Sequence, residues 1–239
     1  AIVRGGVRIV ETAGNNPQQY LPALKAAGIR VIHKCTSVRH ALKAEALGVD
    51  AVSIDGFECA GHTGEEDVPN MVLVPCTADR LSIPFIASGG FGDGRGLAAA
   101  LMLGADGILA GTRFYAATES LAPDAVKRRI TEIGGDDTLR TSVFDIVREK
   151  DWPKPFTIRG ARNALTAEWQ GRETALAAEG KAAVERYNQA VAAQDLEIMG
   201  VFAGEGADLI ADVAPAATLL ERMVGEAEAA LGSAAGLLA

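Results

Sequence analysis

The chain has few cysteines, and they form no pattern that builds a zinc site or a disulfide framework. Cys35, Cys59 and Cys76 are widely spaced, and no CxxC pair occurs. An odd number of isolated cysteines in apolar surroundings argues against both kinds of site. The three histidines do not have metal-ligand spacing either. We therefore expect no bound metal and a reducing, cytoplasmic environment.

Long apolar runs and blocks of positive charge are also missing. No apolar stretch approaches the ~20 residues that a membrane span needs. The formal net charge is −8, without a cluster of lysine or arginine. Such a chain is poorly suited to bind nucleic acid or an anionic membrane. Its 239 residues, 49% of them hydrophobic, are sufficient for one large globular domain.

Short β-branched runs alternate with helical patterns along the first half of the chain. The runs cover 7–11, 29–33, 51–54, 84–88 and 107–110, and the helical patterns between them cover 17–27, 37–47, 70–81 and 94–103. Near-continuous apolar strands are typical of a parallel sheet that is buried on both faces. The alternation predicts a parallel α/β fold.

The regular spacing favours a TIM barrel over a doubly wound sheet. The glycines from Gly90 to Gly96 alternate, and Arg95 occupies the position of the third Rossmann glycine. A complete (β/α)8 barrel has eight strand–helix units, whereas this chain has five. We expect residues 1–119 to be an incomplete barrel, comprising the last five units with three missing from its front.

The pattern changes after Phe114. Residues 120–212 are expected to be a helical addition that covers the active site, with a connecting loop at 141–160 and a helix at 163–194 that breaks near Gly180. Residues 213–239 are expected to form the helix that closes the barrel. Pro215 is well placed in the first turn of that helix.

Small and polar residues follow the last two predicted strands, at Ser88-Gly89-Gly90 and at Gly111-Thr112. Their small side chains let backbone N–H groups approach a phosphate. The helix that begins near Gly94 is expected to point its positive end at the same place. A phosphate-bearing cofactor is therefore expected, although such glycines also suit tight βα turns.

His62 lies between glycines in Gly61-His62-Thr63-Gly64, at the predicted carboxyl end of a strand that starts near Asp50. An imidazole there is placed to transfer protons near neutral pH. A structural, hydrogen-bonded histidine is the alternative. Lys34 directly follows a strand, where it is compatible both with a phosphate contact and with a solvated lysine.

Two stretches closely resemble the nitronate monooxygenase (2-nitropropane dioxygenase) family. They are IHKCTSVRHALKAEALGVDAVSIDGFECAGHTGEEDV and IASGGFGDGRGLAAALMLGADGILAGTRF. The resemblance is specific over residues 7–119 and looser beyond them. It implies an FMN-dependent TIM-barrel oxidoreductase that oxidises alkyl nitronates with O2.

The resemblance also assigns site residues. It places the FMN phosphate on Ser88, Gly89, Gly90, Gly111 and Thr112, with Lys34 near the ring and with Ala60 and Gly61 along its border. It makes His62 the catalytic histidine that faces the flavin. A looser match places the substrate near Phe202, Ala203 and Gly204.

Two other functions remain open. The ECAGH form of the histidine motif also resembles a branch of NADH:quinone reductases, in which NAD(P)H reduces FMN and a quinone reoxidises it. A different class is an inactive barrel fragment or a flavin-binding protein without activity, because three missing units leave strand edges open. A homodimer would cover those edges.

Overall fold

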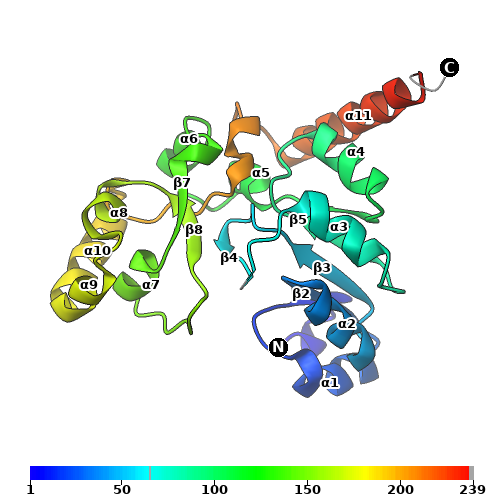
Figure 1. Cartoon of the computed structure of the whole chain (residues 1–239), viewed down its shortest axis with the longest axis horizontal. Coiled ribbons are helices and arrows are strands. Elements are labelled where there is room, and N and C mark those ends of the chain that lie inside the picture. The colour runs from blue at the N-terminus through cyan, green and yellow to red at the C-terminus, as the bar shows by residue number, and fades with distance from the viewer. Residues whose placement is uncertain (65, 237–239) are drawn as a thin grey trace.

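The five expected strands form one parallel sheet in the computed structural model, which describes residues 1–64 and 66–236 (Figure 1). The strand order is β1-β2-β3-β5-β6, and each neighbouring pair is parallel. The strands are β1 (Ile9–Thr12), β2 (Arg30–Cys35), β3 (Ala51–Asp55), β5 (Phe85–Ser88) and β6 (Gly107–Leu109). The prediction of an α/β protein with a parallel sheet is confirmed.

Helices connect these strands and cover one face of the sheet. They are α1 (Leu21–Ala26), α2 (Val38–Leu47), α3 (Asn70–Ala78) and α4 (Gly94–Met102), with short 3-10 turns at Val3–Gly5 and Pro17–Gln19. Local signals set their ends: α2 starts at Ser37, whose hydroxyl accepts from the His40 N–H, and stops at Gly48 with φ +87°. The core between sheet and helices includes Val52 and Ile54, both fully buried.

The opposite face of the sheet is open at the β1–β2 side, so the prediction of burial on both faces is wrong there. Val31 and Cys35 of β2 are buried, whereas Arg30 is exposed and Lys34 is half-buried. Ile9 of β1 is 61% exposed. Because successive side chains of a strand point to opposite faces, this alternation shows that helices cover only one side.

A second, antiparallel sheet lies where the sequence predicted only helices and a connecting loop. Its strands are β4 (Gly61–His62), β7 (Thr138–Thr141) and β8 (Ile158–Ala161), in the order β4-β8-β7. The region 120–212 thus contains two strands, β7 and β8, besides the expected helices and connecting loop. The segments of β7 and β8, TLRT and IRGA, are short and contain arginine and glycine. Neither shows the pattern of apolar residues that indicates a strand.

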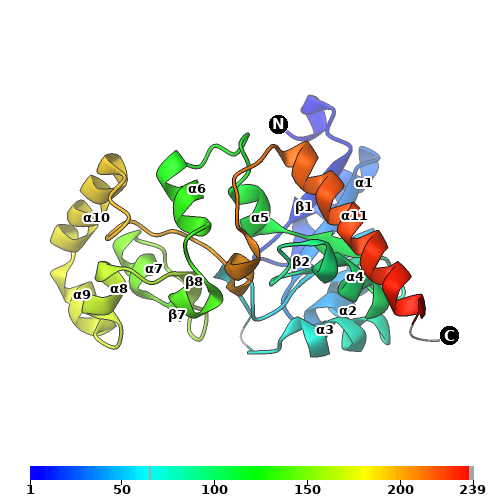
Figure 2. The same cartoon turned by 90° about the horizontal axis from the view of Figure 1, so that it is seen from above.

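The helices after β6 pack into two cores. One includes the fully buried Phe144 together with Leu176 and Tyr187, and helices α7 (Val143–Val147), α8 (Ala164–Trp169), α9 (Glu173–Glu179) and α10 (Lys181–Ala193) contribute to it. The other includes Val126 and Ile130 of α6 (Asp124–Ile130), and Tyr115 of α5 (Gly111–Tyr115) packs against it. The expected break at Gly180 separates α9 from α10. Figures 1 and 2 show α8–α10 at the opposite end of the molecule from α1–α4.

The last helix, α11 (Ala216–Ala235), begins directly after Pro215 and packs along α4 (Figure 2). Gly94 permits the close approach, because a Cβ there would lie 2.2 Å from the Met223 carbonyl oxygen. The expected extension of this helix to Leu238 lies outside the described residues. Within the described part of the chain, no helix has both the length and the apolar character that crossing a bilayer requires.

Candidate functional site

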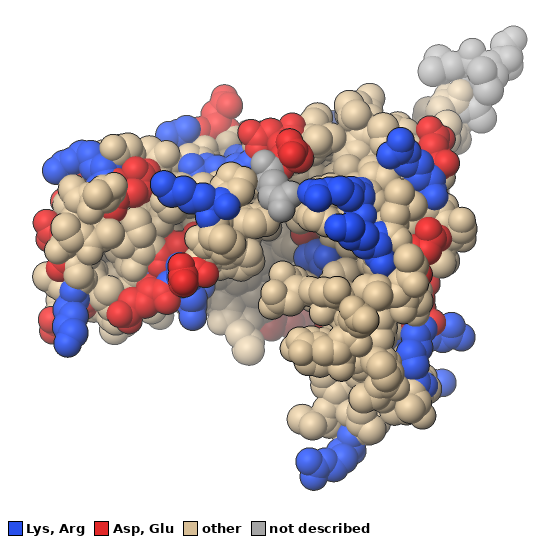
Figure 3. Space-filling view, turned by 60° about the horizontal axis from the view of Figure 1, so that its bottom comes forward, with Lys and Arg blue, Asp and Glu red and all other residues tan. Residues whose placement is uncertain are grey.

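The carboxyl ends of the parallel strands surround a pocket, here called the first pocket. Its lining residues are Lys34, Asp55, Glu58, Cys59, Ala60, Ser88, Gly89, Gly90, Phe91, Leu109, Gly111, Thr112, Gly204 and Gly206. All the expected cofactor residues except Gly61 are among them. Figure 3 shows a recess in the middle of this face of the molecule, with basic side chains along one border.

Glycines give this pocket a wall of bare backbone. Gly89 and Gly90 both have positive φ, +105° and +77°, which side chains rarely tolerate. A Cβ at Gly89 would lie 2.8 Å from Cys59 Sγ, whereas a Cβ at Gly111 would meet no atom within 4 Å. The start of α5 at Gly111 therefore leaves room for a ligand to approach the main chain, whereas a side chain at Gly89 would collide with Cys59.

The N-terminus of α4 does not point a free positive end at this pocket, contrary to expectation. Asp93 accepts hydrogen bonds from the Arg95 and Gly96 N–H groups at 3.0 and 3.2 Å. Glu226 accepts from the Gly94 N–H at 2.9 Å. Two carboxylates already satisfy the first amides of this helix, so α4 offers none of them to an anion.

Lys34 lies in an ion-paired cluster rather than in solvent. Its Nζ is 3.2 Å from Asp55 and 3.8 Å from Glu11. Burial lowers the pKa of Lys34, but these two carboxylates outweigh it and hold the pKa above its usual value. Burial raises the pKa of Asp55, and the lysine charge only partly offsets that rise. The pocket therefore contains a permanently charged ammonium group.

Asn70 holds the backbone after β5 in place, although the sequence carries no motif that would have identified it. Its Nδ2 donates to the carbonyls of Ser88 and Gly89 at 2.8 and 2.7 Å. Its backbone N–H donates to Glu58 Oε1 at 2.9 Å. Asn70 therefore links the loop after β3 to the glycine turn after β5, and both line the first pocket.

The prediction placed His62 at the carboxyl end of the central strand, but it does not lie there. Strand β3 already ends at Asp55, and His62 belongs to β4, where it pairs with Ile158 of β8. It lines a second pocket, together with Ala60, Gly61, Arg148, Lys150, Trp152, Ile158 and Phe202. Ala60 lines both pockets, so the two cavities are adjacent.

The His62 ring is held by two residues that the sequence did not indicate. Its Nε2 lies 3.0 and 2.9 Å from the two carboxylate oxygens of Asp145, 83 positions away. The Trp152 ring stacks on the imidazole, with centroids 3.7 Å apart and planes inclined by 16°. Neither spacing corresponds to a motif, so only the folded chain brings the three side chains together.

The three residues predicted on the substrate side have different positions. Phe202 lines the second pocket and Gly204 the first. Ala203 is fully buried in a hydrophobic cluster and lines neither pocket. Two of the three residues therefore line a pocket, whereas Ala203 belongs to the core.

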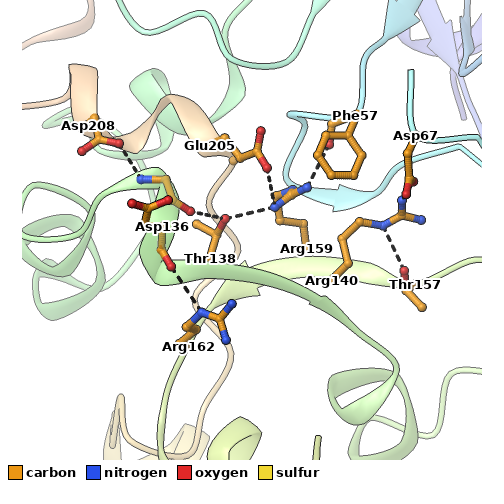
Figure 4. A network of polar contacts seen from close by, with 12 residues as sticks. Phe57, Asp67, Asp136, Thr138, Arg140, Thr157, Arg159, Arg162, Glu205 and Asp208 are labelled. Carbon is orange, nitrogen blue, oxygen red and sulfur yellow. Dashed lines mark hydrogen bonds and ion pairs between the residues drawn. The ribbon is translucent and has the colours of Figure 1, made fainter. Parts of the chain in front are cut away.

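A polar network anchors the loop that carries His62 (Figure 4). Arg159 of β8 donates to the Phe57 carbonyl at 3.2 Å and lies 4.6 Å from the centre of the Phe57 ring. The same guanidinium bonds Thr138 at 3.1 Å and pairs with Glu205 at 3.0 Å. Arg140 pairs with Asp67. Both ends of the loop are thus attached to the second sheet.

The model of the nitronate monooxygenase family matches the chain over residues 2–226. The chain belongs to this family. Several residues of the two stretches that carry the resemblance line one or the other pocket, among them Lys34, His62 and Gly89.

Curated relatives of this nitronate monooxygenase family member have two different names. A Mycobacterium tuberculosis protein, 45% identical over 60% of this chain and 41% of its own length, is a (3aS,4S,5R,7aS)-5-hydroxy-7a-methyl-1-oxo-octahydro-1H-indene-4-carboxyl-CoA dehydrogenase. A Bacillus subtilis protein, 40% identical over 54% of this chain and 39% of its own length, is named "Probable nitronate monooxygenase". The chain thus spans about two fifths of the length of these relatives.

Solved structures share the arrangement over nearly the whole chain. FabK from Thermotoga maritima superposes with a TM-score of 0.84 at 31% identity, covering 99% of this chain and 73% of that one. A nitroalkane oxidase from Streptomyces ansochromogenes gives 0.80 at 26% identity, covering 97% and 67%. The second, antiparallel sheet therefore lies within the part that these proteins share.

Proposed function

We propose that this family member is an FMN-dependent oxidoreductase that oxidises alkyl nitronates with dioxygen. The observation that carries the proposal is that two pockets adjoin at Ala60. Glycines and a lysine line the first pocket, and His62, which is hydrogen-bonded to Asp145, lines the second. A flavin and its substrate must lie side by side for electrons to pass between them. Two adjoining cavities of different chemistry suit that requirement.

The first pocket suits FMN. Gly89, Gly90 and Gly111 line it, and the space beside Gly111 is open, which suits an anion site built from main-chain N–H groups. Lys34, at the end of β2, contributes an ammonium group to the same pocket, where Asp55 and Glu11 pair with it. Bound FMN would supply the redox chemistry.

The second pocket suits a small anionic substrate. Arg148 and Lys150 line it together with the apolar side chains of Ile158 and Phe202. In the proposed reaction these cations hold the charged nitro group, and the apolar side chains exclude water from the alkyl group. His62 donates to, or accepts from, the substrate across the same cavity.

We further propose that the parallel sheet is the last part of a (β/α)8 barrel, with residues 1–119 as its cofactor-binding portion. The regular strand–helix order and the open face at β1 and β2 support this assignment. In this arrangement residues 120–212 cover the site, and α11 packs against the outside of the barrel.

Reconstitution with FMN tests the proposal directly. The purified chain is titrated with FMN, and flavin absorbance retained after gel filtration reports binding. Nitrite released from propyl-2-nitronate in air reports activity, and both signals are expected. A folded chain that takes up no FMN would instead favour the inactive fragment. FMN uptake with quinone-dependent NADH consumption and no nitrite would favour the quinone reductase.

One observation favours a second candidate, a dehydrogenase that acts on a coenzyme A thioester. The relative at 45% identity carries a carboxyl-CoA substrate in its name, and the cations of the second pocket also suit phosphate groups. Free coenzyme A is the discriminating ligand. Competitive inhibition of the FMN-loaded chain by micromolar coenzyme A would favour this candidate over a simple nitronate oxidase.

A further inference from the structure

We propose that Asp145 is a positioning residue that holds the His62 proton on Nε2 and so makes Nδ1 the nitrogen that meets a ligand in the second pocket. The identity of that ligand rests on the proposed function. The orientation of the ring does not, because it is a property of the folded chain.

The hydrogen-bond pattern determines the tautomer. Both oxygens of Asp145 lie within 3.0 Å of Nε2. An ionised carboxylate only accepts hydrogen bonds, so Nε2 must donate and must carry the proton. In the neutral ring, Nδ1 is then the acceptor. No described residue forms a hydrogen bond with Nδ1, which leaves it for a ligand.

Asp145 is rigidly placed. Its side chain is only 5% exposed. Its neighbours on α7, Val143, Phe144 and Val147, are fully buried in the same hydrophobic cluster. A carboxylate on a well-packed helix turn cannot follow a moving imidazole, so it determines the ring's position.

Trp152 restrains the ring from a second direction. It stacks against one face of the imidazole and is 39% exposed. The carboxylate therefore holds the edge of the ring while the indole covers a face. The other charged groups lining this pocket are Arg148 and Lys150, and Asp145 is the carboxylate that contacts the ring.

The direct test is nuclear magnetic resonance of histidine labelled with 15N, performed on the chain without FMN. His62 is assigned by its loss in His62→Asn. The expected result is a neutral His62 with the proton on Nε2. A neutral ring that carries the proton on Nδ1 would overturn the proposal.

The same spectra test the role of the Asp145 charge. In Asp145→Asn, an amide that can also donate replaces the acceptor that fixes the proton on Nε2, so part of the neutral His62 ring is expected to carry its proton on Nδ1. Asp151→Asn is the matched control: it removes one exposed negative charge shortly after α7 and should leave the proton on Nε2. The same tautomer ratio in the two variants would contradict the assignment.

Kinetics of the FMN-loaded chain separate positioning from binding. Asp145→Asn should lower kcat on propyl-2-nitronate by roughly 10- to 100-fold, the size of effect seen when a residue that orients an active-site histidine is lost. The change in KM should be much smaller. Asp145→Glu should recover part of kcat. If only KM changes, Asp145 has no positioning role.

The outcomes distinguish this inference from the proposed function. If FMN does not bind, or nitrite is not formed, the proposed function fails while the Nε2 proton, and its redistribution in Asp145→Asn, can still be observed. If the chain is active but His62 carries its proton on Nδ1, the positioning role fails alone.

Discussion

Thr112 Oγ1 accepts a hydrogen bond of 3.1 Å from the backbone N–H of Gly204, 92 positions away. Thr112 lies in the first turn of α5, directly after β6, whereas Gly204 lies two positions after Phe202 of the second pocket. Both residues line the first pocket. The bond therefore joins the proposed phosphate side of the site to the segment that separates it from the proposed substrate side.

Thr112→Val should weaken FMN binding about tenfold. The change keeps the shape of the side chain but leaves the Gly204 N–H without its acceptor, and an unmet buried donor costs about 1–3 kcal/mol. Thr112→Ser keeps the hydroxyl and should retain most of the affinity. Quenching of FMN fluorescence measures both dissociation constants. Equal affinities for the valine and serine variants would show that the bond is irrelevant to the pocket.

Gly89→Ala should abolish tight FMN binding, because its Cβ would lie 2.8 Å from Cys59 Sγ at a φ of +105°. Gly48→Ala is the matched control, since Gly48 has a φ of +87° with no atom within 4 Å of the added Cβ. Each should lose about 1 kcal/mol or more of stability to backbone strain. Only Gly89→Ala should also lose FMN binding. Retained FMN in a folded Gly89→Ala chain would argue against a phosphate at this turn.

Asp50→Asn should destabilise the chain at neutral pH but much less in acid. Asp50 accepts from the Val31 N–H at 2.7 Å and pairs with Lys25 and Arg30. Burial raises its pKa, but these partners outweigh burial and hold the pKa below its usual value. Because the pKa of Asp50 is lower in the folded chain, its carboxylate stabilises the fold at pH values above its pKa in the unfolded chain, ~3.9. This stabilisation is lost as the pH falls through the pKa of the folded chain.

Urea unfolding at several pH values checks this dependence. The difference in unfolding free energy between wild type and Asp50→Asn should be about 1–3 kcal/mol at pH 7 and should shrink below pH 4. A difference that stays constant down to pH 3 would mean that the carboxylate charge does not stabilise the β2–β3 pair.

Arg159→Met should cost about 3–5 kcal/mol, as expected for breaking a buried ion pair. The arginine is 3% exposed, and its loss leaves the Phe57 carbonyl and Glu205 without their donor. Arg186→Ala breaks an exposed pair with Glu168, whose side chains are 45% and 41% exposed, and should cost under about 1 kcal/mol. Denaturant unfolding compares the two. Similar losses would show that the network in Figure 4 contributes little.

The parallel sheet and its glycine turns could be predicted because their signals are local. Each strand is an apolar run, and each helix begins or ends at a recognisable residue such as Ser37 or Gly48. In such a sheet the carboxyl ends of the strands meet at one edge. Residues far apart in sequence, such as Lys34 and Gly111, could therefore be assigned to one pocket before any distance was known.

The second sheet and the partners of His62 could not be predicted, because they depend on contacts between distant segments. Strand β8 becomes a strand by pairing with β4 on one side and β7 on the other. Likewise, Glu226 occupies the N-terminus of α4 from 132 positions away. Neither contact leaves a periodic pattern in the residues that make it.

By itself, the sequence determined the order of strands and helices, the family resemblance, and the small residues that line the first pocket. Only the tertiary structure decided that His62 faces a separate pocket, that Asp145 and Trp152 hold its ring, and that the face of β1 and β2 away from the helices is open. The physical reason is the separation along the sequence. Backbone propensity and the spacing of apolar residues act over a few neighbouring residues, whereas an ion pair or a ring stack between distant residues forms only when the chain is folded.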